Sequence, residues 1–228
     1  MSPDVAAALA RFAALPLKER LFVRARLLSA PLVELGSRAP PGVIADVGCG
    51  HGLLTALLAV GHPERTVLGV DPDERKIALA RAALRGVGNA RFQVGRIEDL
   101  APSLDAVVVA DVLYLLPVER WGDFLRAARR LLRPGGRLLL KEAEADGSWK
   151  YWKCVAQERV MVQLLRKTQS SGGLQFRPRA FTEGLLREAG FRVEETIALD
   201  RGYATPHVLF VATVLNELSQ RVVEGQEK

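Results

Sequence analysis

The sequence predicts an α/β domain built around a doubly wound, mostly parallel sheet. Between residues 43 and 141, short apolar runs alternate with helical patterns, which is typical of successive βαβ units. A glycine-rich turn directly follows the first run, and acidic residues follow the second and fourth runs. The predicted strands cover residues 43–47, 67–70, 91–94, 106–110 and 137–140.

Two helices of this alternation have recognisable ends. The first opens at Asp71-Pro72 and stops near Gly86. The second begins near Trp121, with apolar residues at helical spacing on one side and arginines on the other. The turn residues 134–136, Pro-Gly-Gly, end this helix and lead into the next strand.

The segments outside the alternation suggest a helical cap, an insertion and a tail. Residues 1–39 predict helices that cap the main domain, which we assign to residues 40–216. Residues 142–178 form an insertion in which Trp149, Tyr151 and Trp152 either shape a substrate lid or pack a helix onto the core. A helix at 181–189 follows, then strands at 191–197 and 208–213 that are close enough in sequence to be antiparallel, and a tail at 217–228.

The composition is that of a single globular domain. Of 228 residues, 49% are hydrophobic and 25% charged, and the start of the chain lacks the pattern of a secretory leader, which favours the cytoplasm and no stable membrane insertion. The net charge of +6 suits an anionic partner, but the arginines are dispersed, so we rank solvated helix faces above nucleic-acid binding. Cys49 and Cys154 are expected to be free thiols, no metal site is expected, and the oligomeric state is not predicted.

The glycine-rich turn is the most informative feature of the chain. It contains Gly48, Gly50 and Gly52 at alternate positions, between a buried strand and a helix at 53–60. Glycines allow a ligand close to the backbone, and a helix N-terminus offers free N–H groups to a carboxylate or phosphate. A turn without a ligand would not explain three glycines together with Asp46. NAD fits less well, because its motif is Gly-x-Gly-x-x-Gly.

Asp71 ends the second predicted strand, roughly 20 residues after the glycine turn, which is the spacing at which an acid accepts hydrogen bonds from ribose hydroxyls. The alternative role for Asp71 is to cap the following helix. Asp111 ends the fourth strand, and its alternative role is also a helix cap. Ligands of open α/β sheets bind at the carboxyl ends of strands, so these groups predict one shared site.

With Asp-x-Gly-x-Gly-x-Gly at 46–52, the acid at Asp71 and Asp-Val-Leu-Tyr at 111–114, the chain resembles class I S-adenosylmethionine (SAM) dependent methyltransferases of the small-molecule type. The resemblance covers residues 43–141, with weaker support to 214. It implies a seven-stranded sheet with an antiparallel last strand, and SAM as cofactor.

The resemblance also implies roles for individual residues. The glycines would lie against the methionine part of SAM, Asp71 would hold the ribose, and Asp46 would brace the loop or contact the amino group. Where the family has Gly-Asp-Ala after the third strand, this chain has Gly95-Arg96, so adenine would be met by the backbone of Ile97 or by the carboxylates of Glu98 and Asp99, unless these only cap a short helix. The residues expected at the cofactor are Asp46, Gly48, Cys49, Gly50, Gly52, Asp71, Pro72, Ile97, Glu98, Asp111 and Val112.

The expected activity is methyl transfer to a small-molecule acceptor, with oxygen as the favoured atom and an apolar acceptor as one option. A hydroxyl acceptor benefits from a general base. The candidates by residue type are His51, Tyr114, Glu142 and His207, each of which also fits a packing or loop role.

Several alternatives stay open. One is an RNA or protein methyltransferase, although methylation of base amines is disfavoured because 111–114 lacks the Asn/Asp-Pro-Pro-aromatic motif. Others are a non-catalytic SAM-binding regulatory protein and an NAD-dependent oxidoreductase. The basic amphipathic stretch 17–28 could touch a membrane surface, but a packed cap helix ranks first.

Overall fold

The computed structural model describes residues 2–145, 147 and 175–214. The aromatic cluster Trp149, Tyr151 and Trp152, the second cysteine and the tail at 217–228 lie outside the described residues.

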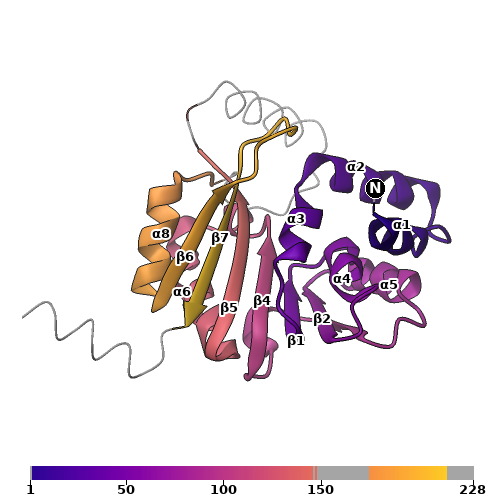
Figure 1. The fold of residues 1–228 in the computed structure, drawn as a ribbon, viewed down its shortest axis with the longest axis horizontal. Helices are drawn as coiled ribbons and strands as arrows, with labels where there is room; N and C mark the ends of the chain where they lie inside the picture. The colour runs from indigo at the N-terminus through magenta and orange to yellow at the C-terminus, as the bar shows by residue number, and fades with distance from the viewer. Residues whose placement is uncertain (1, 146, 148–174, 215–228) are drawn as a thin grey trace, which may run out of the picture.

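A seven-stranded sheet forms the centre of the molecule (Figure 1). The strand order is β3-β2-β1-β4-β5-β7-β6, and β7 runs antiparallel to both of its neighbours. The predicted mostly parallel sheet with an antiparallel last strand is therefore confirmed. The strands are β1 (Gly42–Val47), β2 (Arg65–Asp71), β3 (Ala90–Val94), β4 (Leu104–Ala110), β5 (Leu132–Ala143), β6 (Phe191–Ala198) and β7 (His207–Val214).

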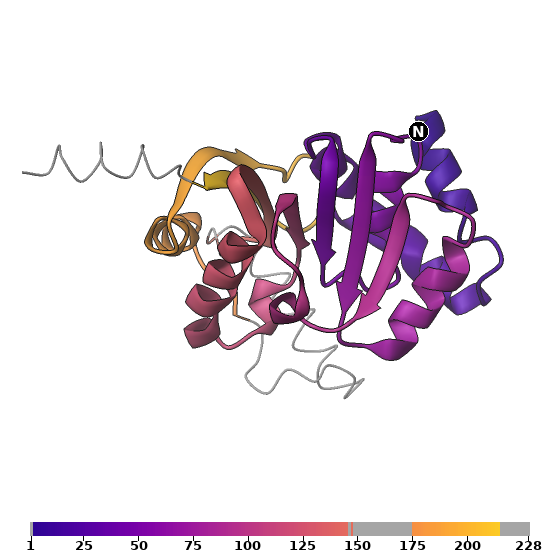
Figure 2. The same cartoon turned by 90° about the horizontal axis from the view of Figure 1, so that it is seen from below.

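Helices cover both faces of the sheet, because neighbouring side chains of a buried strand point to opposite faces. In β1, Ile44 belongs to the apolar cluster shared with α1, α3 and α4, whereas Ala45 belongs to the cluster shared with α6 and α8. In Figures 1 and 2 the first helices lie at one end of the molecule, and α6 and α8 lie towards the other. The helices are α1 (Pro3–Ala10), α2 (Leu17–Ser29), α3 (Leu32–Ser37), α4 (Leu53–Ala59), α5 (Glu74–Ala83), α6 (Trp121–Leu131) and α8 (Arg179–Glu188).

Two boundaries differ from the sequence prediction. Helix α5 begins at Glu74, because the side chain of Asp73, and not that of Asp71, accepts the capping hydrogen bond from Lys76 N. The Pro-Gly-Gly turn at 134–136 lies inside β5 as an irregularity. Along β4 the paired residue advances only from Leu104 to Ala106, while along β5 it advances from Leu132 to Arg137.

Residues 1–39 contain the helices α1, α2 and α3, which contact different parts of the molecule. Helices α1 and α3 pack on α4 and bury apolar residues such as Ala8 and Leu35 in the cluster on that face of the sheet. Helix α2 differs, since its buried residues are Glu19 and Val23, and its polar contacts reach the loops at the carboxyl ends of the sheet strands. Of the three helices, α2 is the one that lies against the candidate site.

Candidate functional site

The three glycines after β1 all have positive φ, at 77° for Gly48, 54° for Gly50 and 80° for Gly52. A Cβ on Gly48 would collide with Val112, and one on Gly52 would lie 3.0 Å from Ala80 Cβ. Those two glycines are thus needed for packing as well as for backbone conformation. A Cβ on Gly50 would meet nothing within 4 Å, so Gly50 is the glycine whose missing side chain leaves open space.

Asp71 joins the glycine loop to the end of β2. Gly50 N donates to Asp71 Oδ2 at 2.9 Å, and Asp73 N donates to Asp71 Oδ1, also at 2.9 Å. Each carboxylate oxygen can accept a further hydrogen bond, so the group is still able to receive ligand hydroxyls. Pro72 lies between Asp71 and the cap residue Asp73.

Asp46 is buried beneath the loop and accepts a hydrogen bond of 2.6 Å from Thr55 Oγ1 on α4. Burial raises the pKa of Asp46 to about 7, against the opposing effect of the Thr55 hydrogen bond. Of the two roles expected for Asp46, this geometry corresponds to bracing the loop. Cys49 is also buried, which raises the pKa of its thiol, and its N–H donates to Val70 O.

The loop after β3 lies beside the end of β2, since Gly95 N donates to Asp71 O at 3.2 Å. A short 3-10 helix, η1 (Ile97–Asp99), follows. Asp99 accepts from Arg96 N and so fills the capping role considered for these acids. Ile97 is buried and Glu98 is exposed. Of these two candidate adenine contacts, Ile97 thus packs in an apolar cluster of the core, whereas Glu98 faces solvent.

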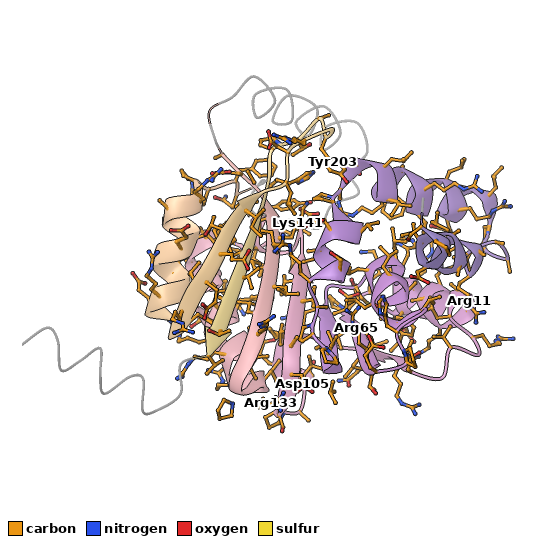
Figure 3. The ribbon with its side chains drawn as sticks, in the orientation of Figure 1. Arg11, Arg65, Asp105, Arg133, Lys141 and Tyr203 are labelled. Carbon is orange, nitrogen blue, oxygen red and sulfur yellow. The ribbon has the colours of Figure 1, made fainter. Side chains whose placement is uncertain are left out.

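A buried ionic cluster lies at the ends of β4 and β5. Asp111 has a φ of 60°, an uncommon conformation for a residue other than glycine. Lys141 Nζ donates to both carboxylate oxygens of Asp111, at 2.6 and 2.7 Å, and Arg26 Nη2 of α2 forms a further ion pair with Oδ2. Figure 3 labels Lys141 within the sheet, in line with a side chain that has no exposed surface.

The charges of this cluster depend on one another. Burial opposes ionisation of Asp111, but Lys141 and Arg26 hold the pKa of its carboxyl below the ordinary value. Burial lowers the pKa of Lys141, against the attraction of Asp111. For Glu142, burial and the charge of Asp111 raise the pKa to about 8. The surroundings of the cluster thus favour the ionised form of Asp111 and the protonated form of Glu142.

Two of the candidate bases have structural partners. Glu142 Oε1 accepts from Val112 N at 3.0 Å and from Leu113 N at 2.9 Å, and thereby holds the start of the turn η2 (Leu113–Leu115). The ring of Tyr114 stacks on Phe176, with the ring centroids 5.3 Å apart.

The two candidate histidines both contact α2. His51 Nε2 lies 3.0 Å from Glu19 Oε2, and its ring packs on Phe22. His207 Nε2 lies 3.0 Å from Ser29 O, and since a carbonyl only accepts, Nε2 carries the proton. His207 Nδ1 is buried and has no hydrogen-bond partner among the described residues, and burial lowers the pKa of the ring to about 4. His207 is thus neutral at pH 7, with an unused acceptor atom.

Three charged residues of the site were not among those predicted from the sequence. Glu19 bonds both His51 and Arg75, Arg26 bonds Asp111, and Lys141 lies at the end of an apolar strand. The lysine was detectable, because a charge that follows the apolar run 138–140 is unusual in a central strand. Glu19 and Arg26 resemble ordinary charges of a surface helix, and their partners lie far away in the sequence.

Within residues 2–145, 147 and 175–214, no group of histidine, cysteine and acidic side chains is arranged to hold a metal ion. In the same part of the chain, no helix combines the length and apolar character needed to cross a bilayer.

The chain matches a known family over the region that contains the glycine turn. The family described as methyltransferase domain matches residues 44–136, which include the glycine turn, Asp71 and Asp111. Residues 44–136 are therefore similar to a methyltransferase domain, in line with the resemblance to class I SAM-dependent methyltransferases. The sheet topology agrees, and the fit of the cofactor is supported by open space at Gly50 beside the Asp71 carboxylate.

Relatives of the domain have several activities. The chain is 37% identical over 119 residues to a trans-aconitate 2-methyltransferase of Deinococcus radiodurans, covering 50% of this chain and 43% of the relative. A ubiquinone biosynthesis O-methyltransferase of Xanthomonas axonopodis is 34% identical over 52% of this chain and 48% of its own length. A ribosomal RNA small subunit methyltransferase G of Burkholderia thailandensis is 35% identical, with 46% of each chain covered. This chain thus spans less than half the length of these relatives.

Solved structures share the fold over most of the chain. A 1,6-didemethyltoxoflavin-N1-methyltransferase of Burkholderia thailandensis, with bound S-adenosylhomocysteine, has a TM-score of 0.66 at 19% identity and covers 95% of this chain and 92% of that one. The mitomycin 7-O-methyltransferase MmcR has a TM-score of 0.67 at 20% identity, over 91% of this chain and 60% of that one. At these identities the likeness concerns the methyltransferase fold alone.

Proposed function

We propose that this protein transfers a methyl group from SAM to an oxygen of a small-molecule acceptor. The observation that carries the proposal is the open space at Gly50 next to the Asp71 carboxylate, within a methyltransferase domain. Bound SAM supplies a methyl group on a sulfonium, which makes transfer an in-line displacement. The protein's main contribution is then to hold the acceptor close and aligned. A cytoplasmic location remains a prediction from the sequence.

The residues of the loop have distinct tasks in this proposal. The backbone around Gly50 would receive the amino-acid part of SAM, and Asp71 would accept hydrogen bonds from the ribose hydroxyls. Asp46, bonded to Thr55, would keep the loop in position. The contacts of Glu19 with His51 and Arg75 would hold α2 over the loop and keep water away from the bound ligand.

For an oxygen acceptor we propose His207 as the residue that accepts a hydrogen bond from the acceptor hydroxyl and positions it, since a ring whose pKa is lowered to about 4 is only a weak base. Its support is a lone pair on Nδ1 that no described group uses, on a neutral ring fixed by Ser29 O. Glu142 is the weaker candidate, because backbone N–H groups already occupy its carboxyl group. We propose Glu142 as a positioning residue that holds Val112 and Tyr114 at the edge of the site.

The test is a methyl-transfer assay with radiolabelled SAM and a panel of small carboxylic acids, phenols, alcohols and amines. We expect label in an oxygen-containing acceptor, and a loss of kcat of about 100-fold or more in His207→Gln with unchanged SAM affinity. Transfer only to amines would contradict the choice of oxygen. A His207→Gln variant with near-normal kcat and an unshifted pH profile would remove the histidine from this role.

RNA is the second candidate acceptor, favoured by the net charge of +6 and by the ribosomal RNA methyltransferase among the relatives. Binding of RNA through basic side chains weakens steeply with salt. A titration of labelled RNA at low and high salt separates the candidates. No binding at low salt eliminates RNA, whereas salt-sensitive binding together with methyl transfer to RNA would replace the small-molecule proposal. SAM binding without turnover on any acceptor would favour a regulatory protein.

A further inference from the structure

Helix α2 carries the most exposed large hydrophobic side chains of the described chain. Leu17, Leu21, Phe22 and Leu28 are 65, 55, 51 and 77% exposed, whereas the remaining exposed large hydrophobic residues of the described chain reach at most 43%. A contiguous group of exposed apolar side chains is typical of a binding surface.

Helical geometry places three of these side chains in one stripe. Leu17, Leu21 and Leu28 are four and eleven residues apart, so they project in nearly the same direction from a helix with 3.6 residues per turn. The opposite side of α2 carries Glu19, Val23 and Arg26, which face the protein. Packing of the inner face therefore leaves the leucine stripe on the outside.

The charges of α2 are divided in the same way. Glu19, the acidic residue of the helix, is buried and bonded to His51 and Arg75, and the Nζ of the largely exposed Lys18 lies 3.6 Å from its Oε1. Lys18 and Arg24 are exposed on the helix that carries the leucines. Within α2, the outward face thus combines leucines with cations and has no acid, which is complementary to an apolar layer under a negatively charged surface.

We propose that α2 docks the protein on anionic lipid membranes, lying flat with the leucine stripe (Leu17, Leu21 and Leu28) in the acyl boundary and with Lys18 and Arg24 at the headgroups. The net charge of +6 adds long-range attraction to such a surface. A helix of 13 residues inserted on one side supports reversible, peripheral binding. Because the inner face of α2 bonds His51 and Asp111, docking places the candidate methyltransferase site next to the lipid.

The test is co-sedimentation of the full chain with vesicles of phosphatidylcholine, with and without roughly 30% phosphatidylglycerol. We expect binding to the anionic vesicles that weakens with salt, and little binding to the neutral ones. The double variant Leu21→Ser with Leu28→Ser should bind at least about tenfold more weakly. Lys18→Gln with Arg24→Gln should also bind more weakly and with a smaller salt dependence.

The matched control is Phe181→Ser on α8, which alters a hydrophobic residue of 42% exposure elsewhere and should leave vesicle binding unchanged. Circular dichroism and calorimetry with SAM on the same variants separate a folding defect or a failure of the methyltransferase proposal from a failure of docking. The proposal is overturned if the wild type ignores anionic vesicles at low salt, or if the leucine variant binds as the wild type does. A dimer that the leucine variant abolishes, without vesicle binding, would assign the face to a second copy and also overturn it.

Discussion

Lys141 donates to both carboxylate oxygens of Asp111 from a side chain with no exposed surface. A buried charge without its partner lowers the stability of the fold. Asp111 and Lys141 therefore stabilise the end of β4 only as a pair. Arg26 of α2 completes the pairing, which connects the N-terminal helices to the centre of the sheet.

Removal of the lysine should therefore destabilise the fold strongly. Lys141→Met would leave Asp111 with Arg26 alone, and we expect a loss of about 3 kcal/mol in the free energy of unfolding, measured by urea denaturation. The control is Lys76→Met, whose half-exposed side chain makes a weak ion pair with Asp73 and should change stability by less than about 0.5 kcal/mol. A loss below about 1 kcal/mol in Lys141→Met would contradict the role of the pair.

Arg26 should hold α2 against the sheet. In Arg26→Met we expect the amide hydrogens of α2 to exchange about tenfold faster or more, because an ion pair to the buried Asp111 is lost. Native-state hydrogen exchange measures this change. Arg24→Met alters an exposed arginine on the same helix and should leave the exchange rates as they are. Equal rates in the two variants would show that α2 is held by other contacts.

Asp46 should make stability depend on pH. Its folded pKa of about 7 lies above the unfolded value of 3.8, so the folded state keeps the proton more tightly. The contribution of Asp46 to the free energy of unfolding is fully present below pH 4 and is lost as the pH rises to about 7. Asp46→Asn cannot ionise and keeps an acceptor for Thr55. Between pH 5 and pH 8 the wild type should lose roughly 3 kcal/mol more than this variant, and parallel pH profiles from denaturation would count against the raised pKa.

Gly50 and Gly135 offer a matched pair for testing the loop. Both have positive φ, and a Cβ on either would meet nothing within 4 Å. Alanine at each position should cost a similar 1–2 kcal/mol or so for the left-handed backbone. Only Gly50→Ala should weaken SAM binding, by about tenfold or more, since its methyl group enters the space assigned to the ligand. Calorimetry and denaturation report the two effects separately, and equal SAM affinities in the two folded variants would show that the space is not the ligand site.

The sequence alone predicted most of the sheet, but little about how α2 lies against the candidate site. The strand runs and the turn at Gly48 to Gly52 are local patterns, and the structure has strands and a turn there. The position of Asp71 followed from the rule that ligands bind at strand ends. Its hydrogen bond to Gly50 did not follow, because the same acid also fitted a helix cap, a role that Asp73 fills.

The contacts of α2 have no local signature. Arg26 and Asp111 are 85 residues apart in the sequence, and only tertiary folding brings them together. The periodicity of 17–28 showed a helix, but not which of its charges turn inward. Similarly, β5 was predicted from its apolar run alone, which left Lys141 unassigned although it follows that run directly.

Isothermal titration calorimetry of the full chain with SAM, S-adenosylhomocysteine and NAD tests most directly whether the glycine loop and Asp71 form a site for a methyl donor. We predict one site that binds SAM and S-adenosylhomocysteine, no heat with NAD, and a clear loss of affinity for both adenosyl ligands in Asp71→Ala. Binding of NAD without binding of SAM would contradict the account.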